Sequence, residues 1–216
     1  MDICLNGIEV DPLEIYLSPI KLYTCLSSNI VSTKYFNTCE NKFNIPVQYE
    51  NYNVATKLFT VTNSIQILLN QEIFTLQEFH IHDMAEHIID DHKGDLEIHF
   101  VFFNNKTPAC ATVLAFIFKN NNDIASNIMI TNILKNKPFI IPNIYTYFTY
   151  SGSLTKTLPV AIPQIAINWL VSYTTCFLNI TKNDLETIRY KSRGSSSPYD
   201  RNGRNVCVIT NASVCC

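Results

Sequence analysis

The sequence predicts a β-rich single domain, and three observations lead to that prediction. The chain has 216 residues, of which 47% are hydrophobic, so it is long enough for one well-packed core and short for two. Runs rich in β-branched and aromatic residues recur along the chain, whereas helical patterns are few. No linker divides it, because the five glycines are too few and the nine prolines are spread along its length. We therefore expect one domain over residues 1–216.

The expected elements follow in chain order. Seven segments are predicted to be strands: 58–69, 74–82, 96–103, 111–118, 140–150, 166–173 and 206–210. A short helix is predicted over 124–134. A second helix is predicted to begin after Thr181, whose side chain can cap a first turn that contains Asp184. The segment 193–198, with the sequence RGSSSP, is predicted to be an exposed loop.

Charge and hydropathy exclude several classes of protein. Sixteen basic residues against eighteen acidic residues give a net charge of -2, which argues against a nucleic-acid binder. No run reaches the roughly 20 apolar residues of a membrane-spanning helix, since the best candidate, 162–180, is interrupted by Gln164, Asn168 and Asn179. Asp2 stands where an export signal would carry positive charge. We expect a soluble cytoplasmic protein.

The eight cysteines show no paired motif. They contain no C-x-x-C spacing, which disfavours a thiolate zinc finger and gives no evident disulfide framework. Most of them are expected to be reduced thiols.

All five histidines fall within residues 80–99. Residues two apart in a strand point to the same face, so His80 and His82 are expected to lie side by side, with Glu78 before them. The next predicted strand places Glu97 and His99 on one face. If the two strands are antiparallel neighbours, three imidazoles converge.

Three neutral imidazoles with one open position are the ligand set of a catalytic zinc ion, which lowers the pKa of a bound water to about 7. Glu78 and Glu97, each two residues before a histidine, are suitably placed to orient the rings. His87 and His92 fit no such phase and are expected to be loop or surface residues.

Other metal motifs fit the sequence less well. No H-E-x-x-H motif occurs, and one residue too many separates His82 from His87 for the inverted motif. His80, His82 and Glu86 partly resemble the first motif of the cupins, which bind a metal inside a small β-barrel. His99 comes too soon to supply the second cupin motif. A cupin-type metalloprotein is therefore a minor alternative.

Several longer motifs occur together in the order of one known family. The family pattern F-H-x-H is matched by FHIH at 79–82 and E-H-x-x-D by EHIID at 86–90, while E-L-H-L-V is matched by EIHFV at 97–101 and Y-W-T-Y-x-G-S-L-T by YFTYSGSLT at 147–155. Weaker matches lie at 18–20, 168–169 and 202–206. Over about residues 18–206, the sequence resembles the alpha-class carbonic anhydrases.

The resemblance implies a large, twisted, mostly antiparallel sheet with short peripheral helices. It implies a Zn²⁺ ion bound by His80, His82 and His99, and reversible hydration of CO2 to bicarbonate and a proton. Glu97 would orient His99, and Thr155, hydrogen-bonded to Glu86, would hold the zinc-bound hydroxide. The apolar wall for CO2 would consist of Val101, Val113, Leu154 and Trp169.

The chain also departs from the family pattern. Only three residues separate His82 from Glu86. Asn63 stands near the position of the usual proton-shuttle histidine and cannot titrate, so proton release would need His87, His92, Lys156 or buffer, and turnover is expected to be slow.

Two functions from different classes follow. One is an active carbonic anhydrase, and the other is a carbonic-anhydrase-like binding protein with weak or no catalysis. Retention of the three histidines together with Thr155 and Glu86 favours the enzyme.

Overall fold

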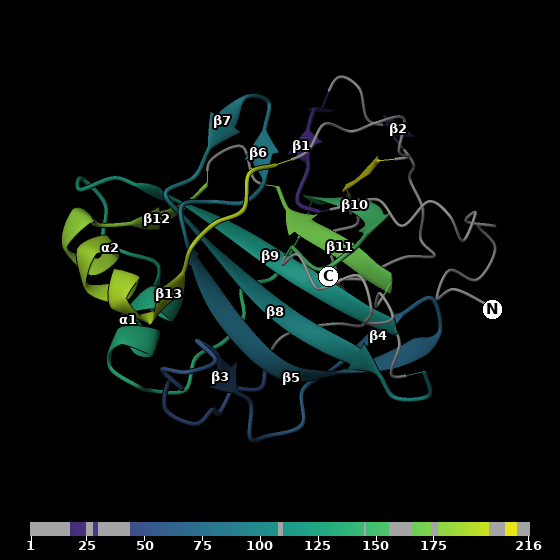
Figure 1. Cartoon of the computed structure of the whole chain (residues 1–216), viewed down its shortest axis with the longest axis horizontal. Coiled ribbons are helices and arrows are strands. Elements are labelled where there is room, and N and C mark those ends of the chain that lie inside the picture. The colour runs from purple at the N-terminus through teal and green to yellow at the C-terminus, as the bar shows by residue number, and fades with distance from the viewer. Residues whose placement is uncertain are drawn as a thin grey trace.

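One large mixed sheet dominates the molecule, with two short helices side by side at one end of it (Figure 1). The computed structural model describes residues 18–24, 28–29, 44–107, 110–144, 146–155, 166–173, 177–198 and 206–210. The strands of the large sheet are β2 (Ser28–Asn29), β3 (Phe59–Thr60), β4 (Gln66–Leu69), β5 (Glu72–Asp83), β8 (Leu96–Asn104), β9 (Cys110–Asn120), β10 (Thr146–Gly152), β11 (Ala166–Ser172), β12 (Leu178–Ile180), β13 (Ser192–Arg193) and β14 (Cys207–Thr210). A small second sheet contains β1 (Lys21–Leu22), β6 (Ile88–Ile89) and β7 (His92–Lys93), and the helices are α1 (Ile128–Leu134), α2 (Lys182–Ile188) and a 3₁₀ turn (Arg189–Lys191).

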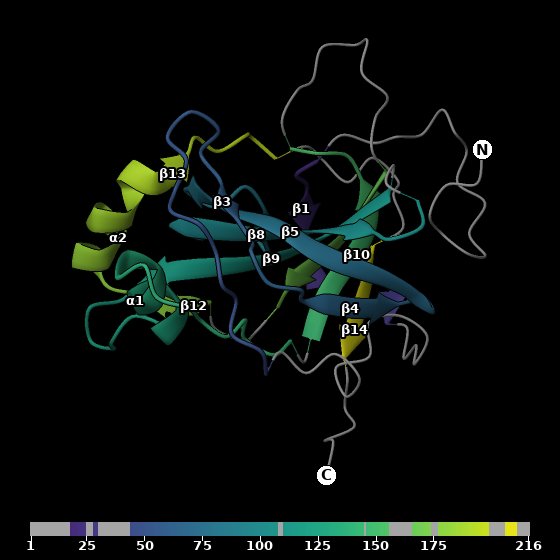
Figure 2. The same cartoon turned by 90° about the horizontal axis from the view of Figure 1, so that it is seen from below.

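The large sheet combines antiparallel and parallel pairs. Its strand order is β13–β5–β8–β9–β11–β10–β14–β2, with β12 beside β9, and with β3 and β4 beside β5. The long strands β5, β8 and β9 are antiparallel to one another, whereas β11 is parallel to β9. Figure 2 shows β10 and β14 crossing the direction of β5 at a steep angle, which is the accumulated twist of the sheet. The predicted fold class, mainly β with a large twisted sheet and short helices at its periphery, is confirmed.

The two faces of the sheet carry separate apolar clusters. Phe79 and Phe100 belong to a cluster that includes Ile133 of α1, so this face packs against the helices. Val101 and Trp169 belong to a second cluster on the opposite face. Because neighbouring residues in a strand alternate between faces, polar residues in phase with Val101 lie on the second face.

The helices begin at residues that cap them. The α2 helix has Thr181 as its N-cap, and the Thr181 side chain accepts a hydrogen bond from Asp184 N at 3.3 Å, as predicted. The α1 helix begins later than the predicted residue 124, because the Asn127 side chain caps it by accepting from Met129 N at 3.0 Å.

Two predicted strands are shorter than expected. The run 58–69 is interrupted where the side chain of Asn63 accepts from Gln48 N at 2.8 Å and donates to Pro46 O at 2.9 Å, which separates β3 from β4. The run 140–150 is a strand only from residue 146 onward, in β10. Ile141 and Ile144 before it are buried in the core, so their apolar character reflects burial and not strand pairing.

No helix among the described residues is long and apolar enough to cross a membrane. Cys110, the first residue of β9, is disulfide-bonded, so the expectation of a reduced thiol is wrong for this cysteine. Disulfides are typical of oxidising compartments, which weighs against the cytoplasmic expectation.

Candidate metal centre

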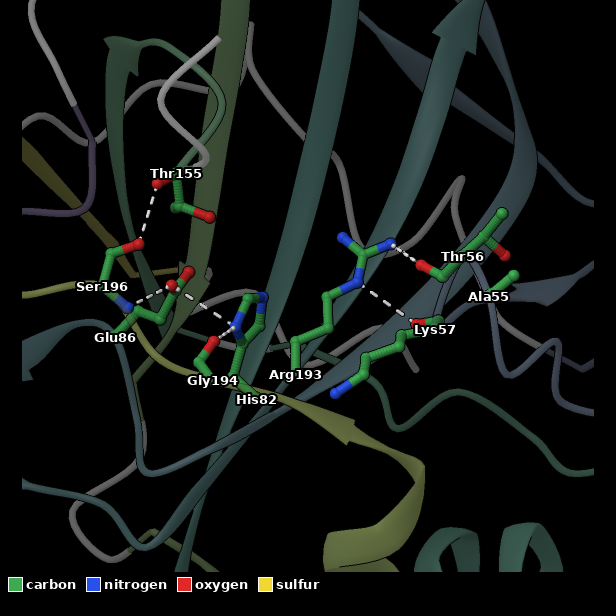
Figure 3. Close-up of a pocket in the computed structure, with 9 residues that line it drawn as sticks. All are labelled: Ala55, Thr56, Lys57, His82, Glu86, Thr155, Arg193, Gly194 and Ser196. Carbon is green, nitrogen blue, oxygen red and sulfur yellow. Dashed lines mark hydrogen bonds and ion pairs between the residues drawn. The ribbon is translucent and has the colours of Figure 1, made fainter.

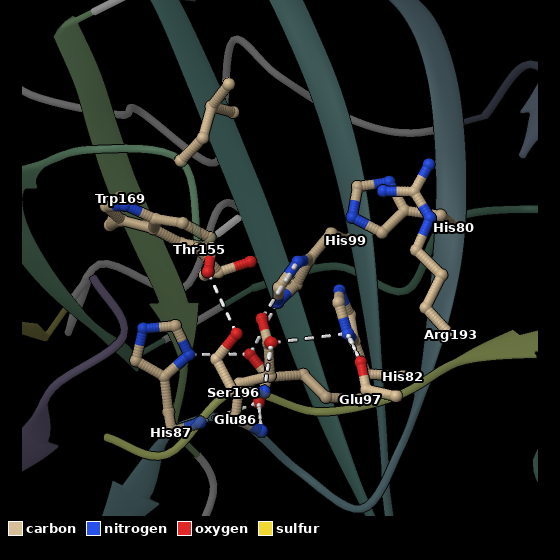
Figure 4. Close-up of polar contacts among 12 residues, drawn as sticks. His80, His82, Glu86, His87, Glu97, His99, Thr155, Trp169, Arg193 and Ser196 are labelled. Atoms are coloured by element: carbon tan, nitrogen blue, oxygen red, sulfur yellow. Dashed lines mark hydrogen bonds and ion pairs between the residues drawn. The ribbon is translucent and has the colours of Figure 1, made fainter. Parts of the chain in front are cut away.

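Three buried histidines meet where β5 and β8 pair. His80 lies directly opposite His99 in the antiparallel register, and His82 follows two residues along β5. The ring centroids are 5.0 Å (His80–His82), 5.2 Å (His80–His99) and 4.6 Å (His82–His99) apart. One ring nitrogen from each lies within 4.8 Å of the others (Figure 4). The predicted convergence of three imidazoles is therefore confirmed.

Hydrogen bonds on the outer side of two rings determine which nitrogens are available. His82 Nδ1 lies 3.0 Å from Gly194 O, and His99 Nε2 lies 2.8 Å from Glu97 Oε1. Carbonyl and carboxylate oxygens only accept, so these two ring nitrogens carry the protons. The lone pairs are therefore on His82 Nε2 and His99 Nδ1, and the buried His82 Nε2 has no hydrogen-bond partner. Both nitrogens can bind a metal ion.

His80 is less firmly held. Glu78 Oε1 lies 3.6 Å from His80 Nδ1, which is too long for a hydrogen bond, so Glu78 stands beside the ring without fixing its tautomer. Burial, together with His99 and His82, holds the pKa of His80 well below its usual range. Burial and His99 also lower the pKa of His82 to about 4. Both rings are thus neutral near pH 7, which is the form that binds metals.

The Glu97 carboxylate is fully buried and accepts four hydrogen bonds. Its Oε1 accepts from His87 Nδ1 at 2.6 Å and from His99 Nε2 at 2.8 Å. Its Oε2 accepts from the backbone N–H groups of Glu86 at 2.8 Å and His87 at 2.9 Å. Burial raises the pKa of Glu97, but the charges and hydrogen bonds of His87 and His99 hold it well below its usual range. A charged, fully satisfied carboxylate therefore fixes the orientation of His99.

His87 lies in the turn between β5 and β6, so its prediction as a loop residue is confirmed, but it is fully buried and is not a surface residue. Its Nδ1 donates to Glu97, which leaves Nε2 to accept from the Tyr150 hydroxyl at 2.7 Å. Its ring centroid lies 4.9 Å from that of Trp169. The available atoms of His87, Glu97 and His99 are already hydrogen-bonded to one another, so this group is a polar network and not a second metal site.

The short connection between β5 and Glu86 turns sharply. Met84 has a left-handed backbone with φ 69°, which is uncommon for a residue with a side chain. Ala85 N then donates to Gly94 O at 3.1 Å. A Cβ atom at Gly94 would come 2.2 Å from Ile117 Cγ2, so only glycine permits this close approach. The turn brings Glu86 into the site although only three residues separate it from His82. The Glu86 side chain is fully buried there.

Glu86 and Thr155 are connected through Ser196. The Ser196 backbone N–H donates to Glu86 Oε1 at 2.7 Å, and the Ser196 hydroxyl donates to Thr155 O at 2.8 Å. Glu86 Oε2 has no hydrogen-bond partner, so the direct bond from Thr155 to Glu86 that the resemblance implies is not formed in this structure. The segment 193–198, predicted as a mere exposed loop, contributes Gly194 and Ser196 to the site. The segment makes three contacts: the Gly194 carbonyl bonds to His82, the Ser196 N–H to Glu86, and the Ser196 hydroxyl to Thr155. Sequence patterns could not predict the first two, because they use backbone atoms.

A cavity of about 290 Å³ opens onto these groups. Figure 3 shows Glu86, Thr155 and Ser196 on one side of it, and Arg193 with the loop 55–57 on the other. His82 lies between the two sides. The cavity therefore joins the histidine cluster to both walls.

The predicted apolar residues lie together beside the histidines. Val101, Val113 and Trp169 occupy directly paired positions on β8, β9 and β11. Leu154 packs against the same cluster, and the Trp169 ring centroid is 5.0 Å from that of His99. The four residues thus form one apolar surface next to His99.

Solved structures of known proteins share this architecture. The alpha-carbonic anhydrase of Photobacterium profundum has a TM-score of 0.70 and 17% identity, over 90% of this chain and 89% of that one. The alpha-carbonic anhydrase of Thermovibrio ammonificans, solved with the inhibitor sulfanilamide, has a TM-score of 0.67 and 18% identity, over 91% of this chain and 88% of that one. The fold is that of the alpha-carbonic anhydrases. Dioscorin complexed with ascorbate has a TM-score of 0.68 and 15% identity, over 93% of this chain and 88% of that one.

No family model matches the sequence, and no curated protein matches it. At these identities the likeness shows the fold alone. Over the described residues the strand order runs from β13 to β2 without the two end strands pairing, so the large sheet is open. The cupin alternative is therefore wrong, since it requires a small closed barrel.

Proposed function

We propose that this protein is a zinc-dependent carbonic anhydrase that catalyses the reversible hydration of CO2 to bicarbonate and a proton. The observation that carries the proposal is the cluster of His80, His82 and His99, whose available ring nitrogens face one another on a buried part of the sheet. The alpha-carbonic anhydrase fold supports the same assignment.

The donor set fits zinc. Three neutral imidazole nitrogens leave a fourth position open in tetrahedral geometry, as catalytic zinc sites require. His82 Nε2 is buried without a hydrogen-bond partner, and such an atom is costly unless a ligand satisfies it. When bound, zinc would supply a Lewis acid that lowers the pKa of water to about 7.

The residues of the chain would prepare the site for this chemistry. Glu97 and the Gly194 carbonyl would hold His99 and His82 in the tautomers that direct a lone pair to the metal. Thr155 would orient the attacking oxygen through its hydroxyl. Ser196, anchored on Glu86, would fix the backbone position of Thr155.

Substrate and proton would use different parts of the cavity. CO2 is small and nonpolar, and the surface of Val101, Val113, Leu154 and Trp169 would give it a dry wall beside His99. Neither His87, which is buried and bonded at both nitrogens, nor Asn63, which cannot titrate, can carry the proton to solvent. We expect the rate to rise with buffer concentration.

The test combines metal analysis with CO2 hydration on the purified protein. His99→Ala is expected to lose zinc and to lower the hydration rate by roughly a hundredfold or more, because it removes a metal ligand. His92→Ala is the matched control for metal binding, since His92 is exposed and should leave the zinc content unchanged. The intact protein should be inhibited by sulfanilamide. Absence of zinc from the intact protein, or full activity in His99→Ala, would contradict the proposal.

The alternative is a carbonic-anhydrase-like binding protein with weak or no catalysis. The missing direct hydrogen bond between Thr155 and Glu86 favours this alternative. Dioscorin, which has the same fold, was solved with ascorbate. The binding protein would be the correct assignment if the intact protein bound one equivalent of zinc and yet hydrated CO2 no faster than His99→Ala.

A further inference from the structure

Arg193 is a half-buried cation on the cavity wall opposite Glu86 (Figure 3). Two cations on the surface have carboxylate partners: Arg189 Nε lies 3.0 Å from Asp83 Oδ1, and Lys119 Nζ lies 3.2 Å from Asp95 Oδ1. Arg193 forms no such ion pair with any described carboxylate. A half-buried guanidinium without a carboxylate partner is costly in free energy unless an anion can reach it.

The hydrogen bonds of Arg193 occupy only one edge of its guanidinium. Its Nε donates to Lys57 O at 3.2 Å, and its Nη2 donates to Thr56 O at 3.0 Å. The opposite edge, formed by Nη1 and the second hydrogen of Nη2, has no partner in the described part of the chain. Because two backbone carbonyls hold the side chain, this edge is a fixed pair of parallel donors, which is the geometry that matches a carboxylate-type anion.

The charges around Arg193 leave it protonated. Burial lowers the pKa of Arg193, while Glu78, Glu86 and Tyr52 act in the opposite direction. Those two carboxylates lie in or beside the histidine cluster, so the cation and the candidate metal site belong to the same cavity. The positive charge of Arg193 also contributes to lowering the pKa of His80, so the guanidinium lies near that ring. An anion bound by Arg193 would therefore be close to the metal ligands.

We propose that Arg193 binds bicarbonate in this cavity through the free edge of its guanidinium. The inference rests on the proposed function, because bicarbonate is the product of CO2 hydration and the substrate of the reverse reaction. Bicarbonate carries the negative charge and the paired oxygens that the edge requires, whereas CO2 carries no charge. Arg193 is thus expected to affect the dehydration KM for bicarbonate and not the hydration KM for CO2.

Bicarbonate binding to the zinc-loaded protein tests the proposal, measured by calorimetry at constant ionic strength with chloride as the reference salt. Arg193→Gln is expected to weaken binding roughly tenfold or more, because it removes hydrogen bonds to a charged group. Arg193→Lys keeps the positive charge but lacks the pair of parallel N–H donors, so it should lose an intermediate amount of bicarbonate affinity. Lys57→Gln is the matched control: it removes an exposed positive charge from the same wall and leaves the Lys57 carbonyl in place, so it should change binding less than twofold.

Three outcomes would overturn the inference: Arg193→Gln or Arg193→Lys binding as tightly as the parent, Lys57→Gln losing as much as Arg193→Gln, or no binding beyond chloride in the parent. If Arg193→Gln does not fold, the comparison of Arg193→Lys with the parent still decides.

The kinetics of CO2 hydration separate this inference from the proposed function. Arg193-dependent bicarbonate binding without CO2 hydration would contradict the proposed function alone. Hydration with bicarbonate binding indifferent to Arg193 would contradict this inference alone.

Discussion

The floor and the rim of the cavity are built in different ways. The group that we call the floor consists of His80, His82, His99 and Glu97, which are side chains of the paired strands β5 and β8, and its member His82 lines the cavity. The rim consists of Glu86, Thr155, Arg193 and Ser196, which come from three separate segments and meet largely through backbone atoms. The floor can therefore be derived from strand alternation, whereas the rim depends on how distant segments pack.

The largest expected effect is in the floor. Glu97→Ala would leave four buried donors without their acceptor, so we expect the free energy of unfolding to fall by about 3–5 kcal/mol and zinc binding to be lost. Urea unfolding of the metal-free protein measures the first effect. Glu50→Ala, at an exposed position, is the control and should stay within about 0.5 kcal/mol of the parent. A loss below about 1 kcal/mol for Glu97→Ala would mean that the network does not stabilise the floor.

A smaller loss of stability is expected at Tyr150, which contacts the floor only through His87. Tyr150→Phe removes the hydroxyl that donates to His87 Nε2, and we expect a loss of about 1–2 kcal/mol in unfolding free energy. Tyr173→Phe is a matched control, because the Tyr173 hydroxyl makes no hydrogen bond within the described part of the chain. Equal stability losses in both variants would show that the bond to His87 contributes nothing specific.

The rim should respond in activity more than in stability. Ser196→Ala keeps the N–H bond to Glu86 and removes only the hydroxyl bond to Thr155 O, so unfolding should change by less than about 1 kcal/mol. If the rim positions Thr155, the CO2 hydration rate should fall roughly tenfold. Ser197→Ala, at an exposed neighbouring position, should leave the rate unchanged. An unchanged rate in Ser196→Ala would remove the rim from the proposed mechanism.

Sequence reasoning predicted the parts of the molecule that repeat a pattern. The strand phase of His80, His82 and His99 was sufficient to place them on one face, and the Thr181 cap was sufficient to place α2. His87 was missed because it lies in a turn where no periodicity applies, although it is as buried as Glu97.

The rim was predicted only through family resemblance, and the direct bond from Thr155 to Glu86 was wrong in this structure. Ser196 carries no signal of its own in the sequence, since any residue but proline could supply its N–H. Arg193 was not identified because its partners are backbone carbonyls.

The Ser196 bridge also joins segments that are far apart along the chain. Glu86 and Ser196 are separated by 110 residues, whereas His87 and Glu97 are separated by 10. Strand β13 already pairs Arg193 with His82 of the floor, so only Ser196 and the residues near it must move for the bridge to open, whereas the Glu86 amide is buried and bonded to Glu97. We therefore expect the rim to open before the floor when the fold loosens, and the Ser196 amide to exchange its hydrogen faster than the Glu86 amide. A protein whose rim has opened in this way would keep its three histidines together while its cavity had lost one wall.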